Sequence, residues 1–70
     1  MRYPVSNLSR RRIDTAARRA NLRNPRVWQD SSLCYFVSGT DSKDRRITIG
    51  TKTVRGLVGV LHDARNRGCF

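Results

Sequence analysis

The residues with the clearest capacity for chemistry in this sequence are arginines, and they occur in clusters. A guanidinium group pairs through two hydrogen bonds with phosphate or with the edge of guanine, whereas the ammonium group of lysine acts as a point charge. One tryptophan stands two residues after an arginine, and an aromatic ring beside cations suits base stacking. The candidate contacts to nucleic acid are Arg10, Arg11, Arg12, Arg18, Arg19, Arg23, Arg26, Trp28, Lys43, Arg45, Arg46, Lys52 and Arg55.

The overall charge favours the same kind of partner. The chain has 15 basic and 5 acidic side chains and a net charge of +10, and 13 of the basic residues are arginine. A surface shaped only by solubility mixes lysine with both acids, whereas here every acid is an aspartate. The imbalance predicts a polyanionic partner. The alternative is that the charge only keeps a small protein monomeric and soluble.

A catalytic site is not expected, because no set of residues supplies a nucleophile with its base or a pair of carboxylates. His62 and Asp63 are adjacent, but neighbours on a helix point in different directions. The segment Gly50–Thr53 lacks the adjacent Gly-Lys pair and the upstream glycine of a phosphate-binding loop. The prediction is a protein that is not an enzyme.

Metal ions and cofactors are not expected either. The nitrogen and sulfur ligands available to zinc are Cys34, His62 and Cys69, and they are scattered along the chain instead of closely spaced. Because Cys69 lies in a terminal tail that should fray, both cysteines are predicted to be free thiols.

Two further features of the sequence bear on where in the cell the protein is found. Residues 1–5 contain no apolar stretch like that of a signal peptide, and no segment approaches the ~20 apolar residues of a membrane span. We therefore expect a cytoplasmic protein with no membrane partner.

The first predicted element is a helix over residues 8–22, preceded by a flexible arm of residues 1–7. The helix is predicted to end before Pro25, because proline disfavours helical backbone in the residue that precedes it. Arg10–Arg12 lie in the first turns, where the positive end of the helix dipole disfavours cations. A bound external anion would offset this unfavourable interaction. The alternative is a solvated charged face with frayed first turns. The apolar positions recur at helical spacing: Ile13, Ala16, Ala17 and Ala20.

The pattern then changes to the two-residue period of strands. Residues 32–38 are rich in aromatic and β-branched side chains, and a polar turn connects them to a returning strand over residues 45–49. Alternation predicts that Ile47 and Ile49 point inward, with Arg46 and Thr48 outward. An optional third strand over residues 26–29 would complete an antiparallel sheet within residues 26–50.

A second helix is predicted over residues 53–67, with Gly68 as its C-terminal cap residue. Lys52 and Arg55 stand at its opening turn, where free N–H groups can hold a phosphate. Gly56 and Gly59 share one side, where either the sheet or a second copy of the chain could approach, so a homodimer is one expectation. Together these elements predict one α+β domain of residues 1–70, with the C-terminal helix packed on one sheet face.

The layout of residues 26–65 resembles the arm-site-binding domains of phage integrases and the DNA-binding domains of plant ethylene-response factors. In those families a three-stranded sheet packs on one helix and enters the DNA major groove with arginine and tryptophan side chains. The resemblance implies that Arg26, Trp28 and Arg46 lie on the sheet face that meets DNA. The chain departs from the pattern in its N-terminal arginine helix and in two glycines of the second helix. The residues that carry the resemblance are Leu33–Val37, Arg45–Thr51 and His62–Ala64.

The leading hypothesis is a small nucleic-acid-binding protein, encoded by a phage or mobile element, whose arginines contact the phosphate backbone of DNA in preference to RNA. The alternative is an interaction module or inhibitor that binds an acidic surface of a host protein, because complementary charge steers either encounter. A third hypothesis is an RNA-binding or ribosome-associated protein. The order helix, strands, helix also resembles double-stranded-RNA-binding domains, although the lysine cluster at their last helix is reduced here to Lys52.

Overall fold

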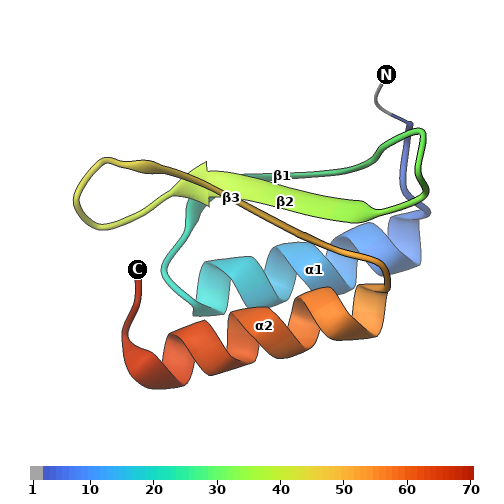
Figure 1. Cartoon of the computed structure of the whole chain (residues 1–70). Coiled ribbons are helices and arrows are strands. Elements are labelled where there is room, and N and C mark those ends of the chain that lie inside the picture. Colours follow the sequence, from blue (N-terminus) through green and yellow to red (C-terminus); the bar gives the residue numbers. More distant parts are fainter. Residues whose placement is uncertain (1–2) are drawn as a thin grey trace.

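The computed structural model describes residues 3–70 and places two helices on one face of a three-stranded antiparallel sheet (Figure 1). The predicted α+β class is confirmed, with three strands in the order β1-β2-β3. Both helices begin at the same end of the sheet and run side by side beneath it (Figure 1). The elements are α1 (Asn7–Arg19), β1 (Arg23–Gln29), β2 (Tyr35–Thr40), β3 (Arg46–Thr51) and α2 (Val54–Arg67).

Helix α1 ends at Arg19, three residues before the predicted end at residue 22. Asn21 adopts the left-handed conformation with φ 72°, and its N–H donates to the carbonyl oxygen of Arg18 at 3.1 Å. The N–H of Leu22 donates to the carbonyl oxygen of Ala17 at 3.0 Å, which completes a Schellman motif. The stop signal is therefore Asn21 and not Pro25.

The early end of α1 leaves residues for a longer first strand than predicted, and the sheet covers residues 23–51 instead of 26–50. The register of β1 shifts between Arg23 and Arg26, and Asn24 has φ 50°, so the strand bulges where Pro25 interrupts it. Proline is tolerated because β1 is an edge strand and needs no donor on its open side.

The predicted arm of residues 1–7 is partly ordered against β1. The N–H of Tyr3 donates to the carbonyl oxygen of Gln29 at 2.6 Å, and the N–H of Gln29 donates back to Tyr3 at 3.1 Å. Ser6 accepts a hydrogen bond from the N–H of Ser9 at 3.3 Å and caps α1. Residues 1 and 2 of the predicted arm lie outside the described residues.

The core lies between the sheet and the two helices. Ile47 and Ile49 pack against it, which confirms the predicted inward positions on β3. The alanine stripe of α1 is buried within the fold, so it offers no surface to a second copy of the chain. The buried cluster consists of Ile13, Ala16, Ala17, Leu22, Val37, Leu57 and Leu61.

Asp41, whose side chain is 1% exposed, organises the turn between β2 and β3. Its Oδ1 accepts the backbone N–H groups of Lys43 at 2.9 Å and Arg45 at 2.8 Å, and its Oδ2 accepts Nε of Arg45 at 3.0 Å. These hydrogen bonds, first among them that from the Arg45 N–H, lower the pKa of Asp41 below its ordinary value.

Helix α2 matches its predicted range to within one residue. Thr53 accepts the N–H of Gly56 at 2.9 Å as the N-cap, and Gly68 ends the helix in the left-handed conformation, as predicted. The two helix glycines differ from expectation. A Cβ on Gly56 would meet the Thr53 hydroxyl at 2.9 Å, whereas one on Gly59 would meet nothing within 4 Å, so neither approaches the sheet backbone.

Within residues 3–70, neither helix is long and apolar enough to cross a membrane.

Candidate nucleic-acid interface

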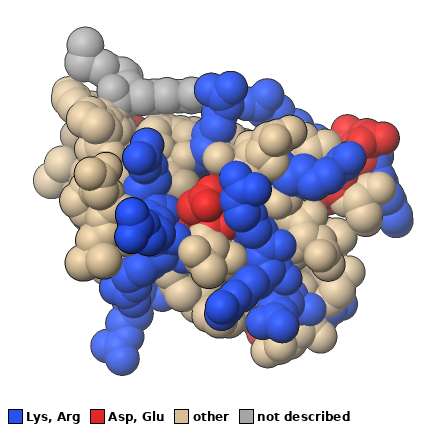
Figure 2. All heavy atoms as spheres, turned by 180° about the vertical axis from the view of Figure 1, so that it is seen from behind, with Lys and Arg blue, Asp and Glu red and all other residues tan. Residues whose placement is uncertain are grey.

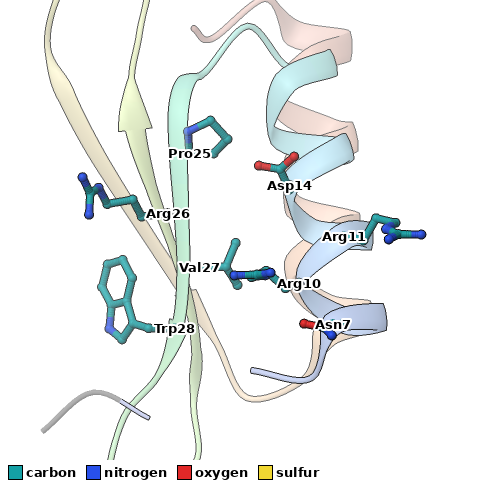
Figure 3. Close-up of a pocket in the computed structure, with 8 residues that line it drawn as sticks. All are labelled: Asn7, Arg10, Arg11, Asp14, Pro25, Arg26, Val27 and Trp28. Carbon is teal, nitrogen blue, oxygen red and sulfur yellow. The ribbon is translucent and has the colours of Figure 1, made fainter. Parts of the chain in front are cut away.

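Alternation along β1 divides its side chains between the two faces of the sheet. Val27 packs against the core, so its neighbours Arg26 and Trp28 point to the opposite, open face. Figure 3 shows both side chains directed away from α1. On β3, Arg46 precedes the inward Ile47 and likewise points outward. The three side chains named by the integrase-type resemblance therefore share the open sheet face.

Trp28 is the end layer of a small stack on this face, with Phe36 in the middle. It lies opposite Phe36 in the register of β1 and β2, and the two rings stack with centroids 5.6 Å apart and planes 10° from parallel. Phe36 in turn lies opposite Gly50 of β3. A Cβ on Gly50 would lie 2.5 Å from Cε1 of Phe36, so the ring occupies the space that a side chain would need.

A groove of about 700 Å³ runs between the first half of α1 and β1 (Figure 3). We call it the α1–β1 groove. Helix α1 supplies one wall and β1 the other, and the two segments come together because the core residues between them pack helix on strand. The lining residues are Asn7, Arg10, Arg11, Asp14, Pro25, Arg26, Val27 and Trp28.

The charge of the α1–β1 groove is strongly positive. Its only acidic lining residue, Asp14, accepts a hydrogen bond from Nε of Arg18 at 3.0 Å, one helical turn further on. Among residues 3–70, Arg10, Arg11 and Arg26 form no ion pair. Arg10 and Arg11 line the groove from α1, and Arg26 and Trp28 line it from β1 with their side chains directed away from α1 (Figure 3).

The arginine run at the start of α1 is divided between two sides of the helix. Arg10 faces the α1–β1 groove, while Arg12 lines a smaller hollow of about 340 Å³ between α1 and α2. Arg11 lines both. Arg19 joins Arg12 in the smaller hollow, together with the exposed His62 of α2. Consecutive residues on a helix point about 100° apart, which accounts for the division.

Three predicted contacts are engaged within the fold. Arg18 pairs with Asp14, and Arg45 pairs with Asp41. Arg23 pairs with Asp44 and donates to the carbonyl oxygen of Asp41 at 2.9 Å, so it ties the start of β1 to the β2–β3 turn. The structure gives these side chains a structural role in addition to any contact with a ligand.

The remaining predicted contacts lie at the two ends of the sheet. Lys43 is exposed in the β2–β3 turn and Arg46 is exposed at the start of β3. Lys52 and Arg55 are exposed at the opening of α2, the end at which α1 also begins (Figure 1). Neither group lines the α1–β1 groove.

The surface view agrees with this distribution. Figure 2 shows the molecule from behind, the side on which α1 and β1 are nearer to the viewer than α2 and β3. Lysine and arginine side chains cover much of this face and surround a small acidic group. Basic side chains therefore gather on the side that carries the groove.

Residues 3–70 contain no group of three or more histidine, cysteine or acidic side chains placed to hold a metal ion. Cys34 and Cys69 are both free thiols, as predicted, and lie in the loop before β2 and in the C-terminal tail.

Sequence reasoning missed two residues that shape the interface. Sequence reasoning gives no role to Phe36, which stacks on Trp28 while its neighbour Tyr35 packs on the core. It also gives no role in the interface to Gly50, which provides the space for the Phe36 ring. The two-residue alternation from Ile49 through the register of β2 and β3 is the signal that could have placed them.

Comparison of the chain with models of known protein families, with curated proteins and with solved structures finds no match.

Proposed function

We propose that this protein is a non-enzymatic nucleic-acid-binding protein that holds a phosphate backbone in the α1–β1 groove. Arg10, Arg11 and Arg26 contact phosphate oxygens, and Trp28 contacts the nucleotide beside them. Guanidinium groups suit this task because their planar array of donors matches the geometry of phosphate oxygens.

One observation carries the proposal: each of the 5 aspartates has a partner within the fold, and Asp14, the one that lines the groove, is paired with Arg18 and not with a groove arginine. Four of the 5 aspartates form ion pairs. The fifth, Asp30, accepts hydrogen bonds from Ser32 and Cys34 in the β1–β2 loop. The repulsion among the groove arginines is therefore relieved best by an external anion.

The helix dipole adds to this argument. The first turn of α1 consists of Asn7, Leu8, Ser9 and Arg10, and the positive end of the dipole lies there. A cation at this end is unfavourable by about 0.3–1 kcal/mol in the free protein. A bound phosphate reverses the balance, because it interacts favourably with both the dipole and the guanidinium groups.

The experiment is a salt series. Binding of the full chain to a short DNA strand and to a duplex is measured by fluorescence anisotropy between 50 and 200 mM salt. If three phosphates are neutralised, the slope of log K against log salt is about −2 for the strand and about −3 for the duplex. A flat response, or no binding at low salt, contradicts the proposal.

A second arm separates nucleic acid from an acidic protein as the partner. The tagged chain is used to recover partners from a cell lysate treated with nuclease. Loss of captured material after nuclease treatment supports the proposal. Retention of one acidic protein, together with a flat salt series on DNA and RNA, favours the protein-binding alternative.

A further inference from the structure

The two edges of the sheet differ in how well they are protected against pairing with another strand. On the β1 edge, Pro25 and the bulge beside it interrupt the ladder of hydrogen-bonding groups. Tyr3 also pairs with Gln29 from outside. Strand β3 contains no proline, and its register with β2 runs without a bulge over Arg46–Thr51. Within residues 3–70 it pairs with β2 alone, so its other edge is open.

Backbone groups point outward from the open edge at every second residue of β3. The carbonyl oxygen of Arg45 accepts the N–H of Asp41 at 2.9 Å, so the backbone groups of Arg45 point toward β2. Because these groups alternate along a strand, the next residue and every second residue after it direct theirs to the open side. The residues with outward N–H and C=O groups are Arg46, Thr48 and Gly50, and all three are exposed.

One flank of helix α2 lies on this side of the molecule and faces away from α1. Val58 and His62 line the hollow between the two helices. Val60 lies about 160° round the helix from each of them, and Gly56 lies one turn before it on the same flank. A Cβ on Gly56 would meet the side chain of Thr51 in β3 at 3.6 Å. Gly56 and Val60 therefore lie on the flank of α2 below the open edge of β3.

This part of the surface, which we call the β3–α2 side, carries little net charge. It consists of the interior of β3, Ile47–Gly50, and of Gly56 and Val60, none of which is charged. Val60 is 43% exposed, and Arg67, further along the same flank, is paired with Asp63 at 3.2 Å. Figure 1 shows β3 and α2 toward the viewer, whereas Figure 2 shows the basic face from behind. In a chain with a net charge of +10, the β3–α2 side is where a second copy approaches with the least repulsion.

The open edge of β3 is complementary to itself when two copies are related by a two-fold axis perpendicular to the sheet at Thr48. Each outward N–H then faces an outward C=O of the other strand, and both pairs of helices lie on the same side of the joined sheets. Thr48 lies opposite Thr48, and Arg46 lies opposite Gly50 of the second copy. An axis at Ile49 instead would place Arg46 opposite Lys52 and bring like charges together. The axis at Thr48 is therefore the favoured one.

We infer that two copies of the chain pair antiparallel through their β3 edges and form a homodimer with one continuous sheet. The pairing brings the two α2 helices side by side, and the small residues Gly56 and Val60 permit their close approach. The α1–β1 grooves lie on the far sides of the two copies and stay accessible. The inference goes beyond the proposed function and does not depend on it. The contact differs from the dimer expected from the helix glycines, because the strand edge supplies its hydrogen bonds.

The mass of the full chain in solution tests this inference. Size-exclusion chromatography with light scattering is run over a range of protein concentrations, at low and at high salt. We expect the mass to rise with concentration from 8.0 kDa toward twice that value. The rise should be larger at high salt, because screening weakens the repulsion between two chains that each carry a charge of +10.

A chain that stays monomeric at every concentration and at both salt levels overturns the inference and leaves the β3 edge to a strand of another protein. Nucleic-acid binding responds to salt in the opposite direction, because binding releases counterions from phosphate. Failure to dimerise and failure to bind nucleic acid are therefore separate results.

A cysteine at the two-fold axis tests the register. In a chain whose own cysteines are replaced by Cys34→Ser and Cys69→Ser, Thr48→Cys is compared with Thr15→Cys on the exposed surface of α1. Opposite residues that exchange hydrogen bonds have Cα atoms about 5.5 Å apart, which lies within the range of a disulfide. Because the dimer holds the two thiols together, we expect T48C to cross-link at least about tenfold faster than T15C under mild oxidation. Equal rates contradict the pairing at Thr48.

A matched pair of variants assigns dimer formation to the backbone of the edge. Thr48→Pro removes the outward N–H, which serves no bond to β2, and Thr48→Val keeps it. We expect T48P to be monomeric at concentrations at which T48V is dimeric, with the same circular dichroism spectrum. Equal dimer formation by T48P and T48V would sink the inference. If T48P fails to fold, the cross-linking rates of T48C and T15C decide the question.

Discussion

Arg26 and Trp28 stand on either side of Val27, and this three-residue pattern connects the core to the interface. Val27 anchors the edge strand to the buried cluster, and the alternation of the strand turns its two neighbours outward. A cation and an aromatic ring thus reach the same groove from a rigid element. Their positions depend on backbone geometry and not on flexible loop conformations.

The contribution of a single groove arginine is testable by its effect on salt dependence. Arg26→Gln removes one phosphate contact, so the slope of log K against log salt should become shallower by about 0.7 for a single strand. Arg65→Gln makes the same charge change on the exposed surface of α2, away from the groove, and serves as the control. Equal slopes for the two variants would contradict the assignment of Arg26 to the interface.

Asp41 gives a pH dependence whose sign follows from its hydrogen bonds. The pKa of its carboxyl group is lower in the folded chain than its ordinary value of 3.8, chiefly through the N–H of Arg45. The stabilisation is therefore fully present above that ordinary value and is lost as the pH falls through the lowered pKa. We expect Asp41→Asn to have a lower Tm than the parent chain at pH 7.

Thermal unfolding followed by circular dichroism between pH 2 and pH 7 checks this expectation. The difference in Tm between the parent chain and D41N should shrink as the pH falls below about 4. A difference that stays constant over the whole range would show that the charge of Asp41 does not stabilise the turn.

At the scale of the element, the end of α1 determines where β1 can begin. Asn21 takes the left-handed conformation that closes the helix, and Leu22 then enters the core. Asn21→Ala should destabilise the fold by about 1 kcal/mol, because a Cβ without a polar group is disfavoured in that conformation. Urea unfolding measures the change.

Asn66→Ala is the matched control for that substitution. Asn66 is exposed within α2, where alanine has the higher helix propensity, so this change should be neutral or slightly stabilising. Equal effects of N21A and N66A would contradict the role assigned to the Asn21 conformation.

Two glycines provide a second matched pair. Gly50→Ala places a Cβ 2.5 Å from the Phe36 ring, so the ring must move, with an expected loss of about 1–3 kcal/mol and a changed Trp28 emission spectrum. Gly59→Ala meets nothing within 4 Å inside a helix and should stabilise by about 1 kcal/mol. An unchanged emission spectrum in G50A would contradict the layered arrangement of Gly50, Phe36 and Trp28.

The elements differ in how far the sequence predicts them. Helix α2 is predicted well because its boundaries are local signals, a threonine cap and a left-handed glycine. Strand β1 is underestimated because Asn24 and Pro25 are poor strand formers, and only pairing with β2 and an open edge allow them.

The candidate site is predicted only in part, for a related reason. Residue types alone single out the arginines and Trp28, but the pairing of Arg18, Arg23 and Arg45 with aspartates depends on contacts in the folded chain. The same holds for the support that Phe36 gives to Trp28, because a single residue of strand register decides it.

At the scale of the whole molecule, the high net charge and the small size together determine the electrostatic field around the protein. The net charge of +10 belongs to a molecule with extents of 30 × 21 × 18 Å, and each of its 5 aspartates has a partner within the fold. Lysine and arginine side chains cover much of the face on the side of α1 and β1 (Figure 2). Under the proposed function, such a field attracts polyanions from solution and orients them toward the groove before contact.

The most direct test of the central claim maps the interface in the intact chain. Amide and indole resonances of ¹⁵N-labelled protein are followed by NMR while an oligothymidylate is added at low salt. The account predicts the largest shifts at residues 7–14, at residues 25–28 and at the Trp28 indole N–H. Shifts concentrated instead on the exposed side of α2 at Gly59, Val60 and Asp63 would contradict it.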